Sequence, residues 1–275
     1  ITLPCSYTLT QLSVGTQPRE NLMPIKIIDY TKSHRGMMVM VYGPPGVGKS
    51  TLGARIAGFD KGTGVVLDFE VGMQEALRET GIKHPGDKTK LFDMSEPNPN
   101  MASDLLEFLK KMREKKEVKW IVLDTLSEMA WSLLQGISGS SQTTLKMYGD
   151  RKKQLKMIMH ELKNLSKLGK NILVLSHEAV GEVEGLPGYY APECPKNDRV
   201  DIVGTFDVVG RLQVLSKTQA AALSLDPGSQ ALNLSRDSQF VSKCRYRIFN
   251  PGESQVVSVA SEKDVLAFIK KLNER

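Results

Sequence analysis

The sequence has few of the residues that form disulfide bonds or metal centres. Its three cysteines lie far apart, at positions 5, 194 and 244, and no C-x-x-C pair occurs. The four histidines, at positions 34, 84, 160 and 177, show no spacing typical of metal ligands. These patterns predict neither a disulfide framework nor a zinc site.

Long apolar runs are also missing from the sequence. No run approaches the ~20 residues that cross a membrane, and no segment has the features of a signal peptide. The 275 residues, 40% of them apolar and 25% charged, have the composition of a globular protein. We therefore expect a soluble, cytoplasmic chain with no membrane partner, folded as one large α/β domain or two small ones.

The charge is positive and unevenly distributed. The net charge is +6, with 18 basic and 17 acidic residues in 1–150 and 19 basic and 14 acidic residues in 151–275. The second part therefore carries +5 of the excess. A basic excess of this kind fits a polyanionic partner, although many soluble proteins without such a partner are equally basic.

The first 22 residues are polar, lack periodicity and contain no methionine. Met23-Pro24 is followed by a short apolar run, Ile25-Lys26-Ile27-Ile28, which predicts a strand. We interpret residues 1–22 as a leader or an expression remnant, with an ordinary flexible arm as the alternative. Residues 23–275 are expected to form a single domain, since no internal repeat and no second boundary is visible.

A phosphate-binding loop organises the chain. Residues 43–51 fit G-x-x-x-x-G-K-[ST], between an apolar run at 37–42 and a helical pattern from residue 52. This order predicts strand, loop and helix, in which backbone N–H groups and the helix N-terminus face a phosphate chain. The predicted nucleotide ligands are Gly43-Pro44-Pro45-Gly46-Val47-Gly48-Lys49-Ser50-Thr51. Lys49 would contact the β- and γ-phosphates of ATP, and the Ser50 hydroxyl would help to hold Mg²⁺.

Three further apolar runs end in polar residues, as strands do at the catalytic edge of an open α/β sheet. Residues 64–69 lead to Glu70, residues 120–123 lead to Asp124, and residues 172–175 lead to Ser176 and His177. Asp124 is predicted to hold Mg²⁺ together with Ser50. His177 is a candidate sensor of the γ-phosphate, with a histidine that merely caps its strand as the alternative.

Two stretches predict irregular structure, and each adjoins basic or aromatic residues. Residues 135–144 are rich in Gly, Ser and Thr and precede a helix expected at 147–168, while residues 178–205 contain several glycines and prolines. Aromatic and basic side chains on such segments can stack on bases and contact phosphates. The candidate DNA-binding residues are Arg151, Lys152, Tyr189, Tyr190, Lys196 and Arg199. A solvated helix end and a surface lid remain the alternatives.

These motifs together resemble RecA-like P-loop ATPases. More closely, they resemble phage-encoded proteins with an AAA nucleotide-binding domain that act as single-strand annealing recombinases. The resemblance extends from about Met23 to Phe249. GPPGVGKST is shared by many ATPase families, so the resemblance rests on the ordered set VVLDFE, WIVLDTLSEM, YGDRKKQL, ILVLSHE and FDVVGRL. It implies a RecA-like α/β core with a mostly parallel twisted sheet flanked by helices. Strands expected near 231–234 and 244–249 would add a late antiparallel extension.

The resemblance also implies roles for individual residues. Glu70 matches the glutamate that activates the attacking water, and Asp124 matches the magnesium aspartate. Ser176-His177 stands where RecA itself has glutamine, so the sensor departs from the family pattern. In RecA-like assemblies basic residues of a late strand contact the neighbour's ATP, and the candidates here are Lys243, Arg245 and Arg247.

The implied function is ATP-dependent binding of single-stranded DNA, leading to annealing and homologous recombination. The implied state is a homo-oligomeric ring or filament with ATP and Mg²⁺ at the subunit interfaces, with a single-strand-binding protein as a further partner. A phage-encoded chain would work in the host cytoplasm.

One alternative function is that of an ATPase that loads or remodels a protein partner such as a replicative helicase. A small-molecule phosphotransferase is disfavoured, because the arginine-rich lid that it would need is missing.

Overall fold

A computed structural model describes residues 35–59, 63–79, 89–183, 186–195, 198–235, 239–245, 249 and 254–273. These residues belong to one compact unit, His34–Arg275. The predicted leader at 1–22, the domain start near Met23 and the strand expected at 25–28 lie outside the described residues.

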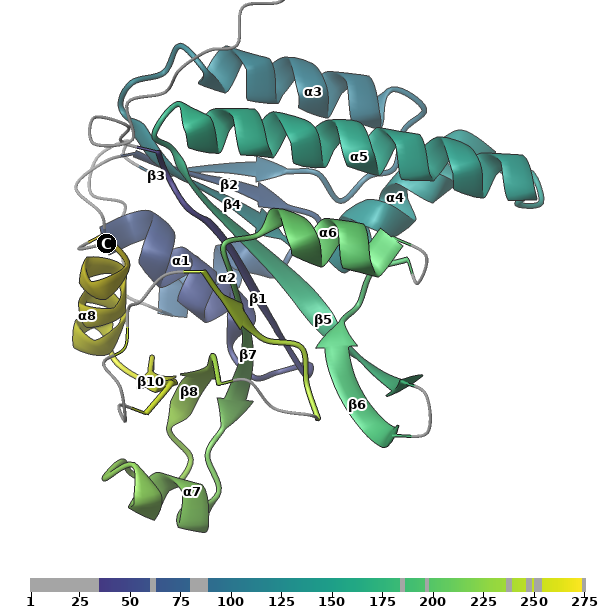
Figure 1. The fold of residues 1–275 in the computed structure, drawn as a ribbon. Helices are drawn as coiled ribbons and strands as arrows, with labels where there is room; N and C mark the ends of the chain where they lie inside the picture. The colour runs from purple at the N-terminus through teal and green to yellow at the C-terminus, as the bar shows by residue number, and fades with distance from the viewer. Residues whose placement is uncertain are drawn as a thin grey trace, which may run out of the picture. The chain divides into compact units, whose positions relative to one another are not determined.

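The centre of the structure is a mostly parallel sheet (Figure 1). Its parallel strands lie in the order β7-β1-β5-β4-β2-β3. Their bounds are β1 Met38–Gly43, β2 Thr63–Asp68, β3 Thr89–Asp93, β4 Val118–Asp124, β5 Asn171–Val183 and β7 Val208–Val214. The register pairs Gly43 with His177 and Asp68 with Asp124. Polar residues that follow different apolar runs therefore meet at the carboxyl edge of the sheet.

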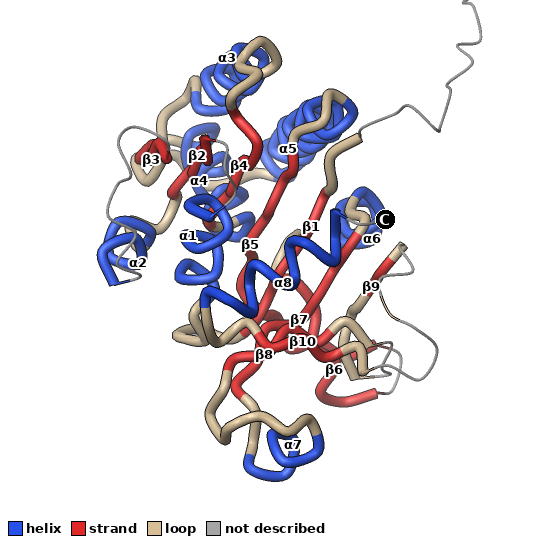
Figure 2. The backbone as a smooth tube through the Cα atoms, turned by 90° about the vertical axis from the view of Figure 1, so that its left-hand side faces the viewer, coloured by secondary structure: helices blue, strands red, loops and turns tan. Residues whose placement is uncertain are grey.

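Helices cover both faces of this sheet (Figures 1 and 2). One face packs on α3 (Met101–Met112), α4 (Leu126–Ser138), α5 (Leu145–Lys167) and α6 (Arg199–Thr205). The other packs on α1 (Lys49–Phe59), α2 (Met73–Glu79) and α8 (Glu262–Asn273). Because both faces are covered, the central strands are continuous apolar runs, and every residue of β1 is buried.

The β7 side of the sheet ends in antiparallel strands, as the sequence predicted. β8 (Gln230–Asn233) pairs with the carboxyl half of β7, and β10 (Val256–Ser258) pairs with β8. β9 (Lys243–Cys244) pairs with the amino end of β7. The short helix α7 (Lys217–Ala222) connects β7 to β8 and packs on a small satellite cluster. The fold is thus the mixed, mostly parallel sheet of RecA-like P-loop proteins, with antiparallel strands at one end.

One prediction of irregular structure was wrong, and another was right over only part of its length. Residues 178–205 form the second half of β5, the strand β6 (Leu186–Pro192) and the helix α6. Prolines 187 and 192 had suggested a loop, yet β6 pairs with β5. On its other side the described residues form a single bridge, Tyr190 with Phe240, and such an edge strand tolerates proline. The stretch 135–144 is also shorter than predicted. α4 runs to Ser138 and α5 begins at Leu145, where the Thr144 hydroxyl caps the helix.

Candidate active site

The phosphate loop joins the end of β1 to the start of α1. Its glycines at 46 and 48 have φ angles of 73° and 91°, which L side chains rarely adopt. A Cβ at Gly48 would also lie 2.2 Å from the Gln230 side chain, and one at Gly43 would lie 2.5 Å from the Leu212 carbonyl oxygen. The Gln230 amide donates to the Val47 carbonyl oxygen at 3.0 Å. The loop is therefore shaped by its glycines and buttressed by β8.

Lys49 opens α1 with its side chain folded into the loop. Its residue is 6% exposed, and Nζ donates to the carbonyl oxygens of Gly43 at 3.0 Å and Pro44 at 2.9 Å. Burial lowers the pKa of this ammonium group, while the carboxylates of Glu70 and Asp124 act in the opposite direction. The charge is thus concentrated where the loop would receive the phosphates of a nucleotide.

Asp124 ends β4 in a completely buried position. Burial raises its pKa to about 7, and the nearby Ser50 hydroxyl partly offsets that effect. Within the described residues, neither carboxylate oxygen has a hydrogen-bond partner of ordinary geometry. An orphaned buried carboxylate beside a hydroxyl fits the oxygen ligands of Mg²⁺, so Asp124 and Ser50 would hold this ion. When bound, Mg²⁺ would neutralise charge on the phosphate oxygens.

Glu70 follows β2 and is fixed by Asp68, a residue that the sequence did not single out. One carboxylate oxygen of Asp68 accepts from the Glu70 N–H at 3.0 Å, and the other accepts from the Met73 N–H at 2.9 Å. Asp68 itself is 3% exposed. The turn between β2 and α2 is therefore held by two hydrogen bonds to one buried carboxylate, which directs Glu70 towards the loop.

His177 lies in β5 opposite Gly43 and forms an ion pair with Glu70 through Nε2. The Glu128 carboxylate is 3.9 Å from the same nitrogen. The hydrogen bond to Glu70 is the main cause that raises the pKa of His177, and burial opposes it. Two carboxylates and an imidazole thus meet beside the phosphate loop.

The backbone of this segment is held by a second residue that the sequence analysis missed, Ser127. Its hydroxyl accepts from the His177 N–H at 3.0 Å and donates to the Glu193 carbonyl oxygen at 3.3 Å. The Ser176 hydroxyl donates to the same carbonyl at 3.0 Å, and the Glu193 N–H donates to the His177 carbonyl oxygen at 2.8 Å. The start of α4, the middle of β5 and the end of the β6 segment are therefore joined at one point.

These groups open into a cleft of about 350 Å³, a volume in the range of ligand pockets. Its walls include much of the predicted phosphate loop, Glu70 and His177, with Asp124 buried nearby. The lining residues are Pro45, Gly46, Gly48, Lys49, Ser50, Thr51, Glu70, Gly72, Glu75, Ala76, Glu79 and His177. The arrangement offers a cation and a hydroxyl for phosphates and a carboxylate that can orient a water molecule.

The predicted DNA-binding residues lie along α5 and the β6–α6 segment. Lys152 forms an ion pair with Asp198 at 2.6 Å, and Arg199 begins α6. Tyr190 is half-buried, with the Arg211 guanidinium 4.2 Å from its ring centre. Tyr189 is half-buried as well. The predicted residues Lys196 and Arg247 lie outside the described residues.

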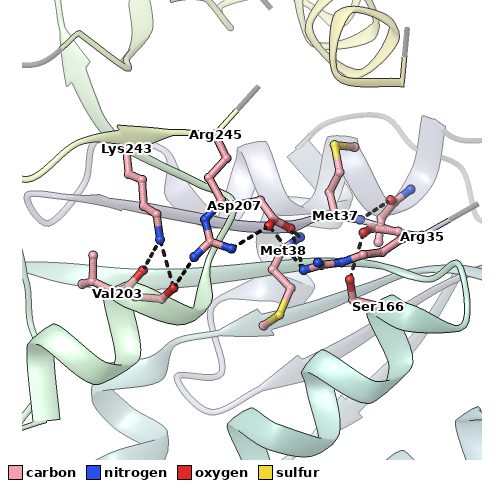
Figure 3. Close-up of polar contacts among 11 residues, drawn as sticks. Arg35, Met37, Met38, Ser166, Val203, Asp207, Lys243 and Arg245 are labelled. Carbon is pink, nitrogen blue, oxygen red and sulfur yellow. Dashed lines mark hydrogen bonds and ion pairs between the residues drawn. The ribbon is translucent and has the colours of Figure 1, made fainter. Parts of the chain in front are cut away.

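Lys243 and Arg245, the candidates for contacting a neighbour's ATP, take part in a polar cluster around Asp207 (Figure 3). The Asp207 carboxylate accepts from Arg35 at 3.3 Å and from Arg245 at 3.4 Å. Lys243 and Arg245 also donate to the Gly204 carbonyl oxygen at 2.9 and 2.8 Å. This cluster lies at the amino end of β7, at the opposite edge of the sheet from the phosphate loop.

The sheet, the phosphate loop and the carboxylates at its edge define a P-loop ATPase with a RecA-like fold. Within that class, residues 35–246 match the family model described as an AAA domain, and the chain belongs to this family.

Solved structures share this fold at low sequence identity. The RadB recombinase matches with a TM-score of 0.51 and 13% identity, over 84% of this chain and 90% of that chain. A DnaB-like replicative helicase matches with a TM-score of 0.48 and 13% identity, over 85% and 58% of the two chains. An ATPase from the type III secretion system of pathogenic bacteria matches with a TM-score of 0.47 and 14% identity, over 77% and 58%. The comparison with curated proteins gave no match.

Among the described residues, no helix is both long and apolar enough to cross a membrane.

Proposed function

We propose that this ATPase binds single-stranded DNA in a manner controlled by ATP and promotes annealing and homologous recombination. Hydrolysis would use the residues of the cleft in distinct roles. Glu70 orients a water molecule for in-line attack on the γ-phosphate, and Lys49 stabilises the charge that develops on the phosphate oxygens. Asp124 and Ser50 supply the oxygen ligands for Mg²⁺.

The observation that carries the proposal is the continuity of β5. This strand runs from Asn171 to Val183 without a break, with His177 at the nucleotide cleft and the hairpin with β6 beyond it. A change in the contact of His177 with the γ-phosphate would therefore move the hairpin as one element with the sensor. Coupling of this kind converts the nucleotide state into a change in affinity at a second surface.

Arg211 links the hairpin to the parallel sheet. It forms a two-point ion pair with Glu178, at 2.5 and 3.2 Å, and its guanidinium covers the Tyr190 ring. Glu178 directly follows His177, and the two side chains of this ion pair are 19% and 6% exposed. The base of the hairpin is therefore tied to β7, through which a displacement of His177 would pass to the hairpin, while Val180 further along β5 is 69% exposed.

The distribution of charge supports a nucleic-acid ligand. Residues 151–275 carry the larger basic excess, and Arg151 and Arg199 lie on the two helices beside the hairpin segment. The resemblance to phage recombinases adds a homo-oligomer with ATP between subunits, a host-cytoplasm location and a single-strand-binding protein as partner. A solved structure that shares this fold is that of a recombinase, RadB.

The test is the fluorescence anisotropy of a labelled oligonucleotide, measured at low and moderate salt with and without a non-hydrolysable ATP analogue. We expect binding that tightens with the analogue and weakens steeply with salt, because phosphate contacts release counterions. Arg151→Ala should weaken binding, whereas the control Lys167→Ala, an exposed cation at the far end of α5, should not. Absence of binding at low salt would reject the proposal and favour an ATPase that loads or remodels a protein partner.

A further inference from the structure

A second cleft lies beside the nucleotide cleft and is larger than it. Its volume is about 430 Å³, and it is formed by α4, the first turns of α5 and the segment that follows β6. The lining residues are Ser127, Glu128, Ala130, Trp131, Arg151, Glu193, Cys194 and Pro195. The two clefts share a wall, since Glu128 lies 3.9 Å from His177 and Ser127 bonds the His177 N–H.

A large aromatic side chain stands exposed in this cleft. Trp131 is 53% exposed, whereas the chain's other tryptophan, Trp120, is 1% exposed. Tyr148, at the start of α5, is 42% exposed and carries the Arg151 guanidinium 5.1 Å from its ring centre. An exposed indole in a pocket offers a flat apolar surface on which another ring can stack.

Arg151, a cation that lines the cleft, differs in its contacts from the basic residues that follow it on α5. Lys152 and Lys156 form ion pairs with Asp198 and Asp201 at 2.6 and 3.0 Å. The Arg151 Nε–H is buried and has no hydrogen-bond partner among the described residues. Of these three cations, Arg151 is therefore the one with an unpaired donor among the described residues.

The remaining charged groups of the cleft decide what can enter it. The Glu128 and Glu193 carboxylates would repel a phosphate placed between them. Carboxylates do accept hydrogen bonds from the amino groups of nucleobases. The cleft therefore suits an uncharged, flat, hydrogen-bonding ring inside, with an anion left outside at Arg151.

We propose that this cleft binds one nucleobase of the single strand, stacked on Trp131, with Arg151 contacting the adjoining phosphate. The inference rests on the proposed function and adds the position of a base on the protein surface. It places that base next to Glu128 and Ser127, the residues through which the cleft adjoins His177. A DNA strand bound in this cleft would lie beside Ser127 and Glu128, the two residues that also contact His177, the proposed γ-phosphate sensor.

Tryptophan fluorescence tests the proposal directly, because one indole is buried and the other is exposed. The full chain is saturated with a non-hydrolysable ATP analogue and titrated with an unlabelled oligonucleotide. We expect quenching as bases stack on Trp131, and little quenching by an oligonucleotide of equal length in which every site is abasic. Trp131→Phe should abolish the quenching while Trp120 still emits.

Affinity measurements add a second readout on the same chain. Trp131→Ala should weaken oligonucleotide binding roughly 5- to 150-fold, the effect of losing one stacked base. The abasic oligonucleotide should bind wild type and Trp131→Ala with nearly equal affinity, because the stacking partner is then already missing. The control Leu168→Ala, at a position 59% exposed and distant along the chain from the cleft, should leave affinity unchanged.

The possible failures are distinguishable from one another. Anisotropy that shows binding without tryptophan quenching would overturn the base-binding cleft and leave the proposed function standing. Quenching that persists in Trp131→Phe would overturn it as well. Absence of oligonucleotide binding by either method would reject both, and capture of a protein partner abolished by Trp131→Ala would reassign the cleft to protein recognition.

Discussion

Glu70 and His177 contact each other beside the phosphate loop, and the hydrogen bond to Glu70 raises the pKa of His177, which favours the protonated imidazole. A carboxylate that holds a protonated imidazole is a poor acceptor for a water proton. The γ-phosphate is a competing anion for the same imidazolium, since His177 lies opposite Gly43 at the start of the loop. We therefore expect ATP binding to draw His177 away from Glu70 and to release the carboxylate for catalysis.

Glu70→Gln should keep nucleotide binding and lose turnover. The amide preserves the shape of the side chain but cannot accept the proton, which should lower kcat by roughly 10²- to 10⁴-fold. The control is Glu75→Gln, which replaces another carboxylate that lines the same cleft and has no predicted role. Binding of a fluorescent ATP analogue, kcat and Tm are measured on one preparation. A variant with reduced Tm but unchanged turnover per folded molecule would show that Glu70 is structural.

Asp124 should make the stability of the magnesium-free protein fall with rising pH. Its pKa is about 7 in the fold, against an ordinary value of 3.8, so between these values the folded state binds more protons than the unfolded state. The free energy of unfolding therefore decreases as pH rises through this window. Asp124→Asn should flatten the decrease and be more stable than wild type at pH 8, by roughly 2–4 kcal/mol.

The measurement for Asp124 is Tm between pH 4 and pH 8 in the presence of a chelator. Asp104→Asn, an exposed position on α3, is the matched control and should leave the profile unchanged. The same Asp124 variant should lose the stabilisation that Mg²⁺ with an ATP analogue gives to wild type. A profile with the same slope in Asp124→Asn and wild type would contradict the assignment.

The helices and strands differ in how well the sequence alone predicted them. The strand, loop and helix around residues 38–59 were predictable because a buried run and a glycine-rich motif are local patterns. The hairpin of β5 with β6 was missed because pairing such as Gly181 with Tyr189 depends on register, which glycines and prolines concealed.

The candidate site also contains residues that the sequence predicted and residues that it did not. Glu70, Asp124 and His177 stand at the ends of apolar runs, and Lys49 and Ser50 stand in the phosphate-loop motif. The structure brings these residues to one edge of the sheet. Asp68 and Ser127 were not predictable, since they act through hydrogen bonds to backbone groups, which leave no pattern in the sequence. Their closeness in sequence to Glu70 and Asp124 was the only available signal.

β5 yields a prediction about coupling, because it carries both His177 and the hairpin. His177→Asn should remove the response of the hairpin to the γ-phosphate, so the ATP analogue should no longer tighten oligonucleotide binding. Binding without nucleotide should persist, because the strand and its ion pair between Glu178 and Arg211 remain. The control is His160→Asn on the exposed face of α5. Unchanged tightening by the analogue in His177→Asn would refute the coupling through β5.

At the scale of the whole molecule, the basic cluster at Asp207 lies at the opposite edge of the sheet from its own phosphate loop. Lys243 and Arg245 therefore serve the chain as structural contacts to Gly204 and Asp207. In a ring or filament with head-to-tail contacts, opposite edges of neighbouring subunits can meet. A role for these cations at the neighbour's ATP would then require the assembled state.

Mixing two inactive variants tests that arrangement. Lys49→Ala removes the phosphate contact within a subunit, and Arg245→Ala removes the cation supplied to the neighbour, so each protein alone should hydrolyse ATP poorly. In an equimolar mixture about a quarter of random interfaces combine an intact loop with an intact Arg245, so activity should return to about that fraction of wild type. Arg35→Ala shares the Asp207 contact and serves as the control for lost stability, with activity expected to remain. If the mixture stays as inactive as its components while both variants keep the Tm of wild type, Arg245 does not act on a neighbouring subunit.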